Sequence, residues 1–496
     1  MMDQANRLYT AEQVRRLDRC AIEDHGIPGI DLMERAGAAV FEAVRQLFPD
    51  ARRYLVLCGG GNNGGDGYIV ARLAMEAGIP VDVCALRDPA ELGGDAALAA
   101  GRWREKGGVP LAWPLEALDA YDVIVDALLG TGLDREPTGA YAEAIEAVNH
   151  ANALIAAVDI PSGLHADTGV ALGITVIADL TVTFIGVKRG LFTADGPDHS
   201  GDVLFDDLKT PDSIHDSESD SGILIQENIF ENLLFDRPLN SHKGDYGSLA
   251  IVGSEVGMSG AVRLAGEAAL RAGAGKVTIG TRPEHASLVN ISCPELMVRA
   301  VTGPEDAGLL LEASDVVVAG TGLGRTDWSR AMLRACIDAG KPMVLDADGL
   351  SLLADMEPER GPRDWVLTPH PGEAGRLLGT SAREVQRDRV AAAQAIAQRY
   401  DAVAVLKGCG TVVARPDGVY AICPLGNPGM STAGSGDVLA GVIGALLGQG
   451  LDTWQAAQAG VVAHASAGDL AASQVGQRGM LASDITNHVP AVLNGV

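Results

Sequence analysis

The sequence predicts an α/β fold in two successive parts, each with a mostly parallel sheet covered by helices. Short apolar runs of strand length alternate with helical stretches along most of the chain, a pattern typical of repeated strand–helix units. Many of these strands end in glycine-rich or polar turns. The 496 residues exceed what one hydrophobic core holds, so two domains of about 200 to 280 residues are expected.

The charge restricts the partners that the chain can bind. It carries 38 basic and 65 acidic residues, a formal net charge of −27. Nucleic acids and anionic membranes bind basic surfaces, so we expect neither as a partner. An anionic ligand must therefore be held by backbone N–H groups and a few well-placed cations.

The cysteines and the apolar segments indicate the compartment. Seven cysteines are scattered without a CxxC pair, which is typical of reduced, intracellular thiols. No apolar run approaches the ~18 to 20 residues of a membrane span, and the start lacks a signal-peptide core. We expect a cytoplasmic protein. Without an HExxH motif or a Cys/His array, a structural zinc site is not expected.

The first half opens with two amphipathic helices between Tyr9 and Phe48, with Thr10 and Asp31 as expected caps. A buried strand over 54–58 then runs into the glycine-rich segment 59–67. A strand, a glycine loop and a helix open many nucleotide-binding units, although such loops also occur without a ligand. Further elements are predicted as strands over 81–86, 123–126 and 154–159 and helices over 68–77, 95–106 and 141–149.

Three loops of this half follow predicted strands: Asn62–Asp66, Gly130–Glu136 and Asp159–Ser162. In open parallel sheets, ligands bind beyond the carboxyl ends of the strands, so we expect these loops to converge on a binding site.

A cation is one possible ligand of these loops. Asp126 and Asp159 end strands, and Asn63 and Ser162 stand in the loops beside them. Such carboxylate, amide and hydroxyl oxygens suit a hard cation. The alternative is that each acid only caps the next turn.

A polar, acidic segment over 209–222 is predicted to be a linker or exposed loop, with the domain boundary near residue 220. We therefore expect domains over residues 1–215 and 222–496. The strand–helix alternation then resumes, with strands over 249–253, 276–279, 316–319, 343–345, 365–367 and 402–406 and a helix over 260–272.

The stretch Gly426–Leu439, GNPGMSTAGSGDVL, carries the clearest chemical signal of the second half. Its small residues lead into an apolar helical run, so the turn presents backbone N–H groups at a helix N-terminus. Glycines let a phosphate approach the main chain, and the helix dipole favours negative charge there. Asp437 is placed to take a proton from a hydroxyl group; the alternative is that it only caps the helix.

Other strand ends of this half carry further candidates. Lys407 ends an apolar strand and is expected to hold a diphosphate, although a solvated lysine would give the same pattern. His370, between two prolines, is either a donor to substrate or a loop histidine with a protein partner. For Asp346 and Asp348, capping is favoured over magnesium binding.

Taken together, several motifs resemble one family, the bifunctional NAD(P)H-hydrate repair enzymes. The first half carries LMERAG (32–37), GGGNNGGDG (59–67), DALLGTGL (126–133) and DIPSGL (159–164). The second half carries HKGDYG (242–247), PELM (294–297), GTGLGR (320–325), DADGL (346–350), TPHPGE (368–373), LKG (406–408) and STAGSGDVLAG (431–441). The resemblance implies a Rossmann-like three-layer epimerase domain followed by a ribokinase-like α/β dehydratase domain.

The resemblance also implies a reaction for each half. The first would interconvert the R and S forms of hydrated NADH or NADPH, and the second would dehydrate the S form with ADP as co-substrate. In that second reaction, Asp437 would activate the ring hydroxyl for attack on the terminal phosphate of ADP, while Gly434–Gly436 hold the developing charge. AMP and phosphate would be released.

Site residues follow from the same resemblance. In the first half, hydrate contacts fall on Asn62, Asn63, Gly64, Gly65, Asp66, Gly130, Thr131, Gly132, Leu133, Asp134, Arg135, Glu136 and Asp159, and a potassium ion on Asn63, Asp126 and Ser162. In the second half, hydrate contacts fall on Ala261, Gly322, His370 and Asp437, and ADP contacts on Lys407, Gly408, Cys409, Gly410, Thr411 and Gly436.

Asp159 is the expected acid/base of the epimerisation, with Lys188 as the alternative. Magnesium is expected in the second half, the substrates are small molecules, and we expect a homo-oligomer. The chain departs from the family pattern at Ala433 and Gly349, both exchanges between small residues.

Two other functions use the same motifs. The second half alone suits a ribokinase-type small-molecule kinase, and the first half suits a binding scaffold without activity. The fused NNGGDG segment argues against the kinase, and Asp159, Asn63 and Asp126 argue against the scaffold.

Overall fold

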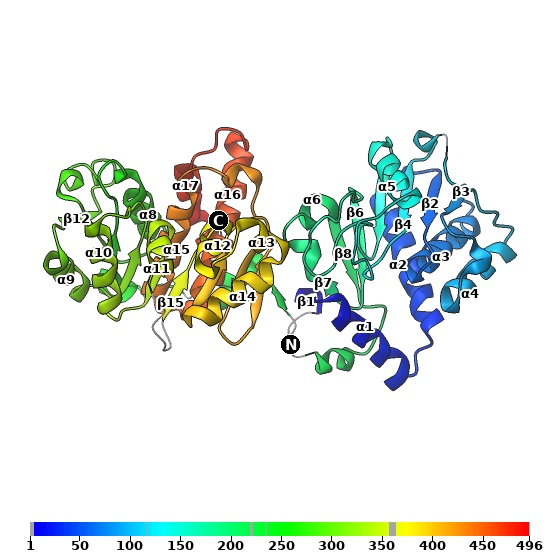
Figure 1. Cartoon of the computed structure of the whole chain (residues 1–496), viewed down its shortest axis with the longest axis horizontal. Helices are drawn as coiled ribbons and strands as arrows, with labels where there is room; N and C mark the ends of the chain where they lie inside the picture. The colour runs from blue at the N-terminus through cyan, green and yellow to red at the C-terminus, as the bar shows by residue number, and fades with distance from the viewer. Residues whose placement is uncertain (1–3, 116, 219–221, 235, 357–363, 496) are drawn as a thin grey trace. The chain divides into compact units, whose positions relative to one another are not determined.

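The structure, a computed structural model, describes residues 4–495 except 116, 219–221, 235 and 357–363. The chain divides into two compact units, Met1–Ile223 (unit 1) and Leu224–Val496 (unit 2). Figure 1 colours unit 1 from blue to green and unit 2 from green to red. Within the described ranges, no helix has both the length and the apolar character that crossing a membrane requires.

Unit 1 contains a six-stranded parallel sheet in the order β3, β2, β4, β5, β6, β8. The chain runs from β2 to β3 on one side and returns to β4 on the other, so the strand order reverses between β2 and β4. Ligands bind at the carboxyl ends of strands at such a reversal. The strands are β2 (Tyr54–Cys58), β3 (Val81–Ala85), β4 (Val123–Ala127), β5 (Leu154–Val158), β6 (Leu180–Phe184) and β8 (Asp202–Asp206).

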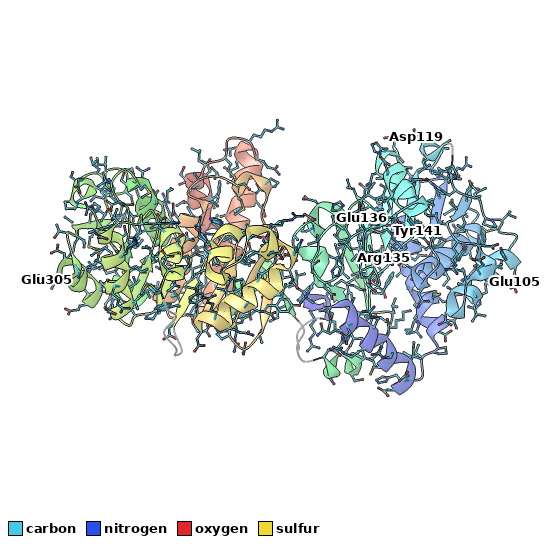
Figure 2. All side chains as sticks on the ribbon, viewed as in Figure 1. Glu105, Asp119, Arg135, Glu136, Tyr141 and Glu305 are labelled. Atoms are coloured by element: carbon cyan, nitrogen blue, oxygen red, sulfur yellow. The ribbon has the colours of Figure 1, made fainter. Side chains whose placement is uncertain are left out.

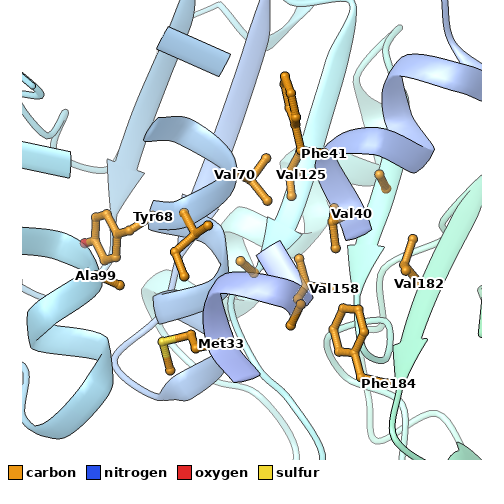
Figure 3. Packing of buried hydrophobic residues seen from close by; sticks show 14 of the residues in the cluster. Met33, Val40, Phe41, Tyr68, Val70, Ala99, Val125, Val158, Val182 and Phe184 are labelled. Atoms are coloured by element: carbon orange, nitrogen blue, oxygen red, sulfur yellow. The ribbon is translucent and has the colours of Figure 1, made fainter. Parts of the chain in front are cut away.

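Helices bury both faces of this sheet because successive strand side chains point to opposite faces. In β2, Val56 and Cys58 belong to the apolar cluster that contains side chains of α2, α3 and α4, part of which is seen in Figure 3. Leu55 and Leu57 belong instead to the cluster that contains side chains of α5. These helices are α2 (Gly29–Leu47), α3 (Asn62–Glu76), α4 (Gly94–Glu105) and α5 (Ala140–His150).

The first helix, α1 (Ala11–Arg19), begins as predicted. The Thr10 side chain accepts a hydrogen bond from the Gln13 N–H and forms a capping box with that residue. The helix continues as a π-helical turn, Cys20–Asp24. The cap predicted at Asp31 is wrong, because α2 begins at Gly29 and Asp31 lies in its first turn, where a carboxylate still favours the helix dipole.

The glycine-rich segment after β2 is mostly helix, so the helix start predicted at residue 68 is wrong. Helix α3 begins at Asn62. A Cβ atom on Gly64 would lie 2.2 Å from the Gly59 carbonyl oxygen, and one on Gly67 would lie 2.6 Å from the Ala127 Cβ. Glycine is therefore required because α3 lies directly against the ends of β2 and β4.

Residues 212–218 are not the exposed linker that their composition predicts. They include a 3₁₀ segment, Asp212–Ser217, in which Ile214 and His215 are buried. The His215 ring nitrogen Nδ1 lies 3.0 Å from the Tyr9 hydroxyl, and Arg16 donates to both carboxylate oxygens of Glu218 at 2.6 and 2.8 Å. These contacts pack the segment against the start of unit 1.

Unit 2 contains a mostly parallel sheet in the order β12, β11, β10, β13, β14, β15, β16, β17, β18. Strands β12 to β16 are parallel, and β16, β17 and β18 are antiparallel. The strands are β10 (Ser248–Val252), β11 (Lys276–Thr281), β12 (Met297–Ala300), β13 (Val316–Ala319), β14 (Met343–Leu345), β15 (Trp365–Leu367), β16 (Val403–Leu406), β17 (Thr411–Ala414) and β18 (Tyr420–Cys423). The predicted bounds of β13, β14 and β15 are confirmed.

The helices of unit 2 include the predicted apolar helix α15, which follows the GSGD turn. The principal helices are α8 (Ser259–Arg271), α9 (Pro304–Glu312), α10 (Asp327–Asp338), α11 (Ala347–Ala354), α12 (Pro371–Leu378), α13 (Ala382–Arg387), α14 (Arg389–Tyr400), α15 (Ser435–Gly448), α16 (Thr453–Val475) and α17 (Ala482–Asn494).

Helix α15 packs closely against its neighbours through glycines. A Cβ on Gly441 would lie 2.1 Å from the Ala265 carbonyl oxygen in α8, and one on Gly444 would lie 2.5 Å from a Val318 methyl in β13. Backbone atoms of a packed helix cannot move away as a side chain can. The glycines thus fix the position of α15, whose N-terminus carries the predicted anion site.

We predict that Gly441→Ala destabilises unit 2 by about 1 to 3 kcal/mol or more, because the new methyl group overlaps the α8 backbone. Gly308→Ala is the matched control, since Gly308 also lies within a helix and its Cβ would meet open space. The control should be neutral or stabilising by up to about 1 kcal/mol. Denaturant unfolding of both variants measures the difference, and equal stabilities would contradict the packing argument.

Candidate functional site

A cavity of about 810 Å³ in unit 1 is lined by the residues that follow β2, β4 and β5. It brings together most of the predicted hydrate contacts of this half; Arg135 and Glu136 are labelled in Figure 2, together with Tyr141, which also lines the cavity. Gly64 and Gly65 are not in its lining, because they are buried within α3 and pack against Gly59 and Met33. The predicted residues in the lining are Asn62, Asn63, Asp66, Gly130, Thr131, Gly132, Leu133, Asp134, Arg135, Glu136 and Asp159.

Asp159 and Lys188 form a buried ion pair in this cavity. The Lys188 ammonium donates to the Asp159 carboxylate and, at 3.0 Å, to the carbonyl oxygen of Phe184. The Lys188 side chain is only 1% exposed. The carboxylate also accepts from the Phe184 N–H and the Thr183 hydroxyl, each at 3.3 Å. Both predicted acid/base candidates are therefore held in one hydrogen-bonded group.

The backbone beside this pair is strained. Asp159 has φ 67° and Ile185 has φ 60°, and a β-branched residue with positive φ is uncommon. Both line the cavity. Such strain costs roughly 1 to 3 kcal/mol per residue and is concentrated at functional sites, where the surrounding structure enforces it.

The three residues predicted to bind a cation lie around the carbonyl group of Leu129. That oxygen accepts a hydrogen bond from the Asn63 side chain and lies close to the Ser162 hydroxyl oxygen, each at 3.1 Å. The Ser162 hydroxyl also donates to Asp126 at 2.7 Å. Asp126 accepts from the Leu128 N–H at 3.2 Å, so the capping alternative describes part of its role.

This oxygen set fits a monovalent cation better than a divalent one. Burial raises the pKa of Asp126 to about 6, and hydrogen bonds from Ser162 only partly offset that effect. No cluster of three or more His, Cys, Asp or Glu suited to a metal occurs among the residues that the structure describes. One carboxylate among neutral oxygens provides a single negative charge, which a bound monovalent cation would balance.

Sequence reasoning missed two carboxylates of this cavity, Asp18 and Asp95. Val14, Asp18 and Ile22, spaced by four residues, all line it from α1 and the turn that follows. The available signal was that Asp18 stands in the apolar stripe of an amphipathic helix, where a charged residue is unexpected.

In unit 2, the GSGD turn forms the start of α15. The N-cap is Gly434, with φ 92°, and no side chain caps the helix there, so the capping alternative for Asp437 is not seen. Helix α15 begins at Ser435 and carries Asp437 in its first turn. The free N–H groups of this turn are available to an anion.

A partly buried lysine, Lys407, stands beside this turn. A Cβ on Gly436 would lie 3.1 Å from the Lys407 nitrogen and 3.3 Å from the Oδ2 of Asp346. The Lys407 ammonium donates to Asp346 Oδ1 at 2.6 Å and lies 4.0 Å from Glu373 Oε2. Thr368 donates to the same Asp346 oxygen at 2.8 Å. The capping predicted for Asp346 is wrong, because its side chain holds Lys407 and does not cap α11.

Burial and charge alter the proton affinities in this group. Burial, followed by the neighbouring Asp346 carboxylate, raises the pKa of Asp437 to about 7. Burial lowers the pKa of Lys407, but Asp346 and Glu373 outweigh it and the net shift is upward. The site therefore pairs a lysine that stays charged with a carboxyl group that titrates near neutral pH, as a general base requires.

The five predicted ADP contacts from Lys407 to Thr411 run from the end of β16 to the start of β17. Gly408 and Gly410 have φ values of 141° and 60°. Arg389 contacts the end of β16 just before this turn. It is 1% exposed and donates to the Leu406 carbonyl at 3.1 Å. Sequence reasoning missed this arginine, since nothing in the sequence marks it as buried.

The remaining predicted hydrate contacts fall into two groups. A Cβ on Gly322, where φ is 58°, would lie 3.0 Å from the Cβ of Ala261, so these two residues are neighbours. His370 is the N-cap of α12, and its Nδ1 accepts from the Gly372 N–H at 3.0 Å. This makes His370 a loop histidine with a protein partner; its side chain is 52% exposed, and its other nitrogen, Nε2, lies 3.3 Å from the Oε1 of Glu373.

A buried histidine supports the GSGD turn. The Nε2 of His464 in α16 lies 3.2 Å from the Ser435 hydroxyl. Burial lowers the pKa of His464 to about 4, so the ring is neutral at neutral pH. Sequence reasoning missed this contact because the two residues are brought together only by the packing of α16 against α15.

Two family models match this chain. The model described as "YjeF-related protein N-terminus" matches residues 29–190. The model described as "NAD(P)H-hydrate dehydratase" matches residues 249–491. The matched ranges lie in unit 1 and unit 2, and they contain both sites described above, except for the cavity residues Val14, Arg15, Asp18, Ile22 and Leu208.

Relatives of known name align over almost the whole chain. The bifunctional NAD(P)H-hydrate repair enzyme Nnr of Coxiella burnetii is 45% identical over 488 residues, covering 98% of this chain and 99% of the relative. The protein of the same name from Escherichia coli is 45% identical over 491 residues, covering 98% and 94%.

A solved structure agrees with unit 2. The ADP/ATP-dependent NAD(P)H-hydrate dehydratase of Bacillus subtilis, co-crystallised with ATP and Mg²⁺, is 31% identical with a TM-score of 0.51, covering 55% of this chain and 98% of that chain. The predicted fold class, an α/β chain with a Rossmann-like first part and a ribokinase-like second part, is confirmed. The chain belongs to the family of bifunctional NAD(P)H-hydrate repair enzymes.

Proposed function

We propose that this chain repairs hydrated NADH and NADPH with one reaction in each unit. Unit 1 interconverts the R and S hydrates, and unit 2 dehydrates the S hydrate at the expense of ADP, giving NAD(P)H, AMP and phosphate. The main support is the start of α15, where Asp437, Lys407 and free backbone N–H groups occur together.

In unit 2, the Asp437 carboxylate removes the proton from the ring hydroxyl, whose oxygen then attacks the terminal phosphorus of ADP. The bond between that phosphorus and AMP breaks, while Lys407 and the N–H group of Gly436 hold the negative charge. The nitrogen lone pair of the ring then expels the phosphate. Loss of a proton from the adjacent ring carbon restores the reduced nicotinamide.

ADP and Mg²⁺ fit the charges of this site. The turn Gly408–Thr411 and Gly436 are proposed to bind the nucleotide, with Lys407 at its phosphates. Asp346 and Glu373 offer carboxylate oxygens of the kind Mg²⁺ prefers. The bound ion would neutralise phosphate charge. The Bacillus subtilis relative, co-crystallised with ATP and Mg²⁺, supports this assignment.

In unit 1, we propose that the hydrate occupies the 810 Å³ cavity and that Asp159 transfers a proton as the bond between the ring carbon and its hydroxyl oxygen opens and closes. Potassium is proposed to bind at Asn63, Asp126 and Ser162, where it would balance the buried carboxylate. The ion would fix the loop after β4, which supplies seven of the proposed substrate contacts.

A small-molecule kinase is the alternative for unit 2. It would use the same lysine and carboxylate but would leave the phosphate on the product. The names of the relatives that span both units favour repair. Incubation with ADP and hydrated NADH, followed by absorbance at the reduced-nicotinamide band, separates the two, since a kinase would give no recovery.

Three further assignments remain proposals. We infer small-molecule substrates without a nucleic acid or membrane partner, a homo-oligomer, and a cytoplasmic location. Sedimentation of the full chain tests the oligomeric state.

We predict that Asp437→Asn lowers the dehydration rate by about 10² to 10⁴-fold, because the base is lost while the shape is kept. Recovery of reduced nicotinamide from the S hydrate and ADP measures this rate. Interconversion of the R and S forms by the same variant is the internal control and should not change. Dehydration at the wild-type rate would contradict the assignment of Asp437.

The raised pKa of Asp437, about 7, predicts the pH dependence of dehydration. The base acts only when ionised, so kcat/KM should be constant above about pH 7 and fall about tenfold for each pH unit below it. A profile that stays flat down to pH 5 would mean that another group, with an ordinary carboxyl pKa, accepts the proton.

Removal of potassium is predicted to slow epimerisation and leave dehydration unchanged. Asp126→Asn should weaken potassium activation by roughly 10 to 100-fold. A loss of this size already follows when a residue that only hydrogen-bonds to a metal ligand is replaced. The matched control is Asp122→Asn, because Asp122 precedes β4 at its opposite end and binds backbone N–H groups there. An epimerisation rate of the wild-type protein that is the same with and without potassium would contradict the cation assignment.

A further inference from the structure

Asp18 has an unusual environment for a surface-helix carboxylate. It lines the same cavity as Asp159 and Lys188 but comes from α1, a different wall. Within the described part of the chain, the Asp18 carboxyl group has no hydrogen-bond partner, and only burial and neighbouring charges act on it. Asp18 is partly exposed at the cavity, and its carboxyl oxygens lack a protein partner among the described residues, so they are available to a ligand that occupies the cavity.

Helix α1 is held firmly enough to position this group. Its Ala11 N–H donates to Asp167 at 2.6 Å, and Arg16 forms the two-bond ion pair with Glu218. On its inner face, Val14 and Leu17 pack so closely over Gly186 that a Cβ there would lie 3.1 to 3.2 Å from them. The helix therefore carries Asp18 as a fixed part of the cavity wall.

The charges around Asp18 come from every element at this end of the cavity. They are Lys188 of β7 (Val187–Lys188), Asp159 after β5, Asp66 of α3, and Arg19 of its own helix. Burial, opposed by Lys188, raises the pKa of Asp18 to about 6. Asp159, in contrast, is paired directly with the Lys188 ammonium. Asp18 and Asp159 thus stand in different environments within a cavity that other carboxyl groups also line, and a pair of this kind is the usual arrangement for an acid and a base in one site.

We propose that Asp18 is the second catalytic residue of the epimerase site, acting on the hydrate together with Asp159 from the other wall. This inference rests on the epimerisation proposed above. It adds a residue from outside the segment matched by the family model, which begins at residue 29.

The reaction needs one proton donor and one proton acceptor. Protonated Asp18 gives its proton to the ring hydroxyl, the carbon–oxygen bond breaks and water leaves. The lone pair of the ring nitrogen forms a carbon–nitrogen double bond. A water molecule then adds to the opposite face of that carbon and gives a proton to the Asp159 carboxylate. The proton returns to Asp18 through solvent in the open cavity, and the reverse reaction exchanges the two roles.

The test uses the full chain with Asp18→Asn, Asp18→Glu and Asp159→Asn, and follows conversion of the R hydrate to the S hydrate by chromatography. For Asp18→Asn we expect kcat to fall about 10² to 10⁴-fold with KM changed less than about threefold. Asp18→Glu should recover part of kcat because it restores the carboxyl group. The pH limb that Asp18 causes in the wild type should vanish in Asp18→Asn and persist in Asp18→Glu.

The matched control is Glu23→Gln, which removes one negative charge from the exposed turn after α1, outside the cavity lining. It should keep the wild-type kcat. In every variant, the rate of dehydration of the S hydrate shows whether unit 2 is still active. Thermal unfolding shows whether unit 1 is still folded. If Asp18→Asn does not fold, the pH profile and kcat of Asp18→Glu decide the question.

The outcomes separate this inference from the proposed function. Wild-type protein that cannot interconvert the hydrates overturns the epimerase assignment itself. If the wild-type protein interconverts the hydrates, two results overturn the role of Asp18. One is a kcat of Asp18→Asn within about threefold of the wild-type kcat, and the other is a change in Asp18→Asn that affects only KM. Equal losses in Asp18→Asn and Asp18→Glu also overturn it, since they indicate a packing role.

Discussion

Both sites depend on a lysine that is largely removed from water and held by one aspartate. In unit 1, Lys188 is paired with Asp159, and in unit 2, Lys407 is paired with Asp346. Removing an ammonium group from water costs several kcal/mol, and only a well-formed ion pair with additional hydrogen bonds compensates that cost. Thr368 and the Phe184 carbonyl provide those additional bonds. Each pair fixes a positive charge where the proposed reactions need it, before any substrate binds.

Glycine places those charges next to a helix N-terminus. In unit 1, α3 approaches the strand ends at Gly64, and in unit 2, α15 approaches α8 at Gly441. Larger residues would push the helices away and separate the backbone N–H groups from the ion pairs. Although the two units have different strand orders, the same packing constraint positions the proposed site in each.

These constraints explain what could be predicted from the sequence. Buried strands such as Val316–Ala319 are continuous apolar runs between turn residues, so their bounds were predictable. The start of α3 was not, because glycines suggest a loop when their neighbours are unknown. The role of Asp346 was missed for the same reason: its partner Lys407 is 61 residues away in the sequence. The cavity residues in the loops after β2, β4 and β5 were predicted from motifs, whereas Asp18 lies outside every motif.

The contacts of residues 212–218 have a practical consequence for dissecting the protein. Glu218 anchors α1 through Arg16, and Ile223 pairs with Arg7 in the strand that precedes that helix. A fragment that stops at residue 215 would lack both attachments. Helix α1, which forms one wall of the cavity, would then be held less firmly. An isolated first unit therefore has to extend through Ile223 if it is to represent the intact enzyme.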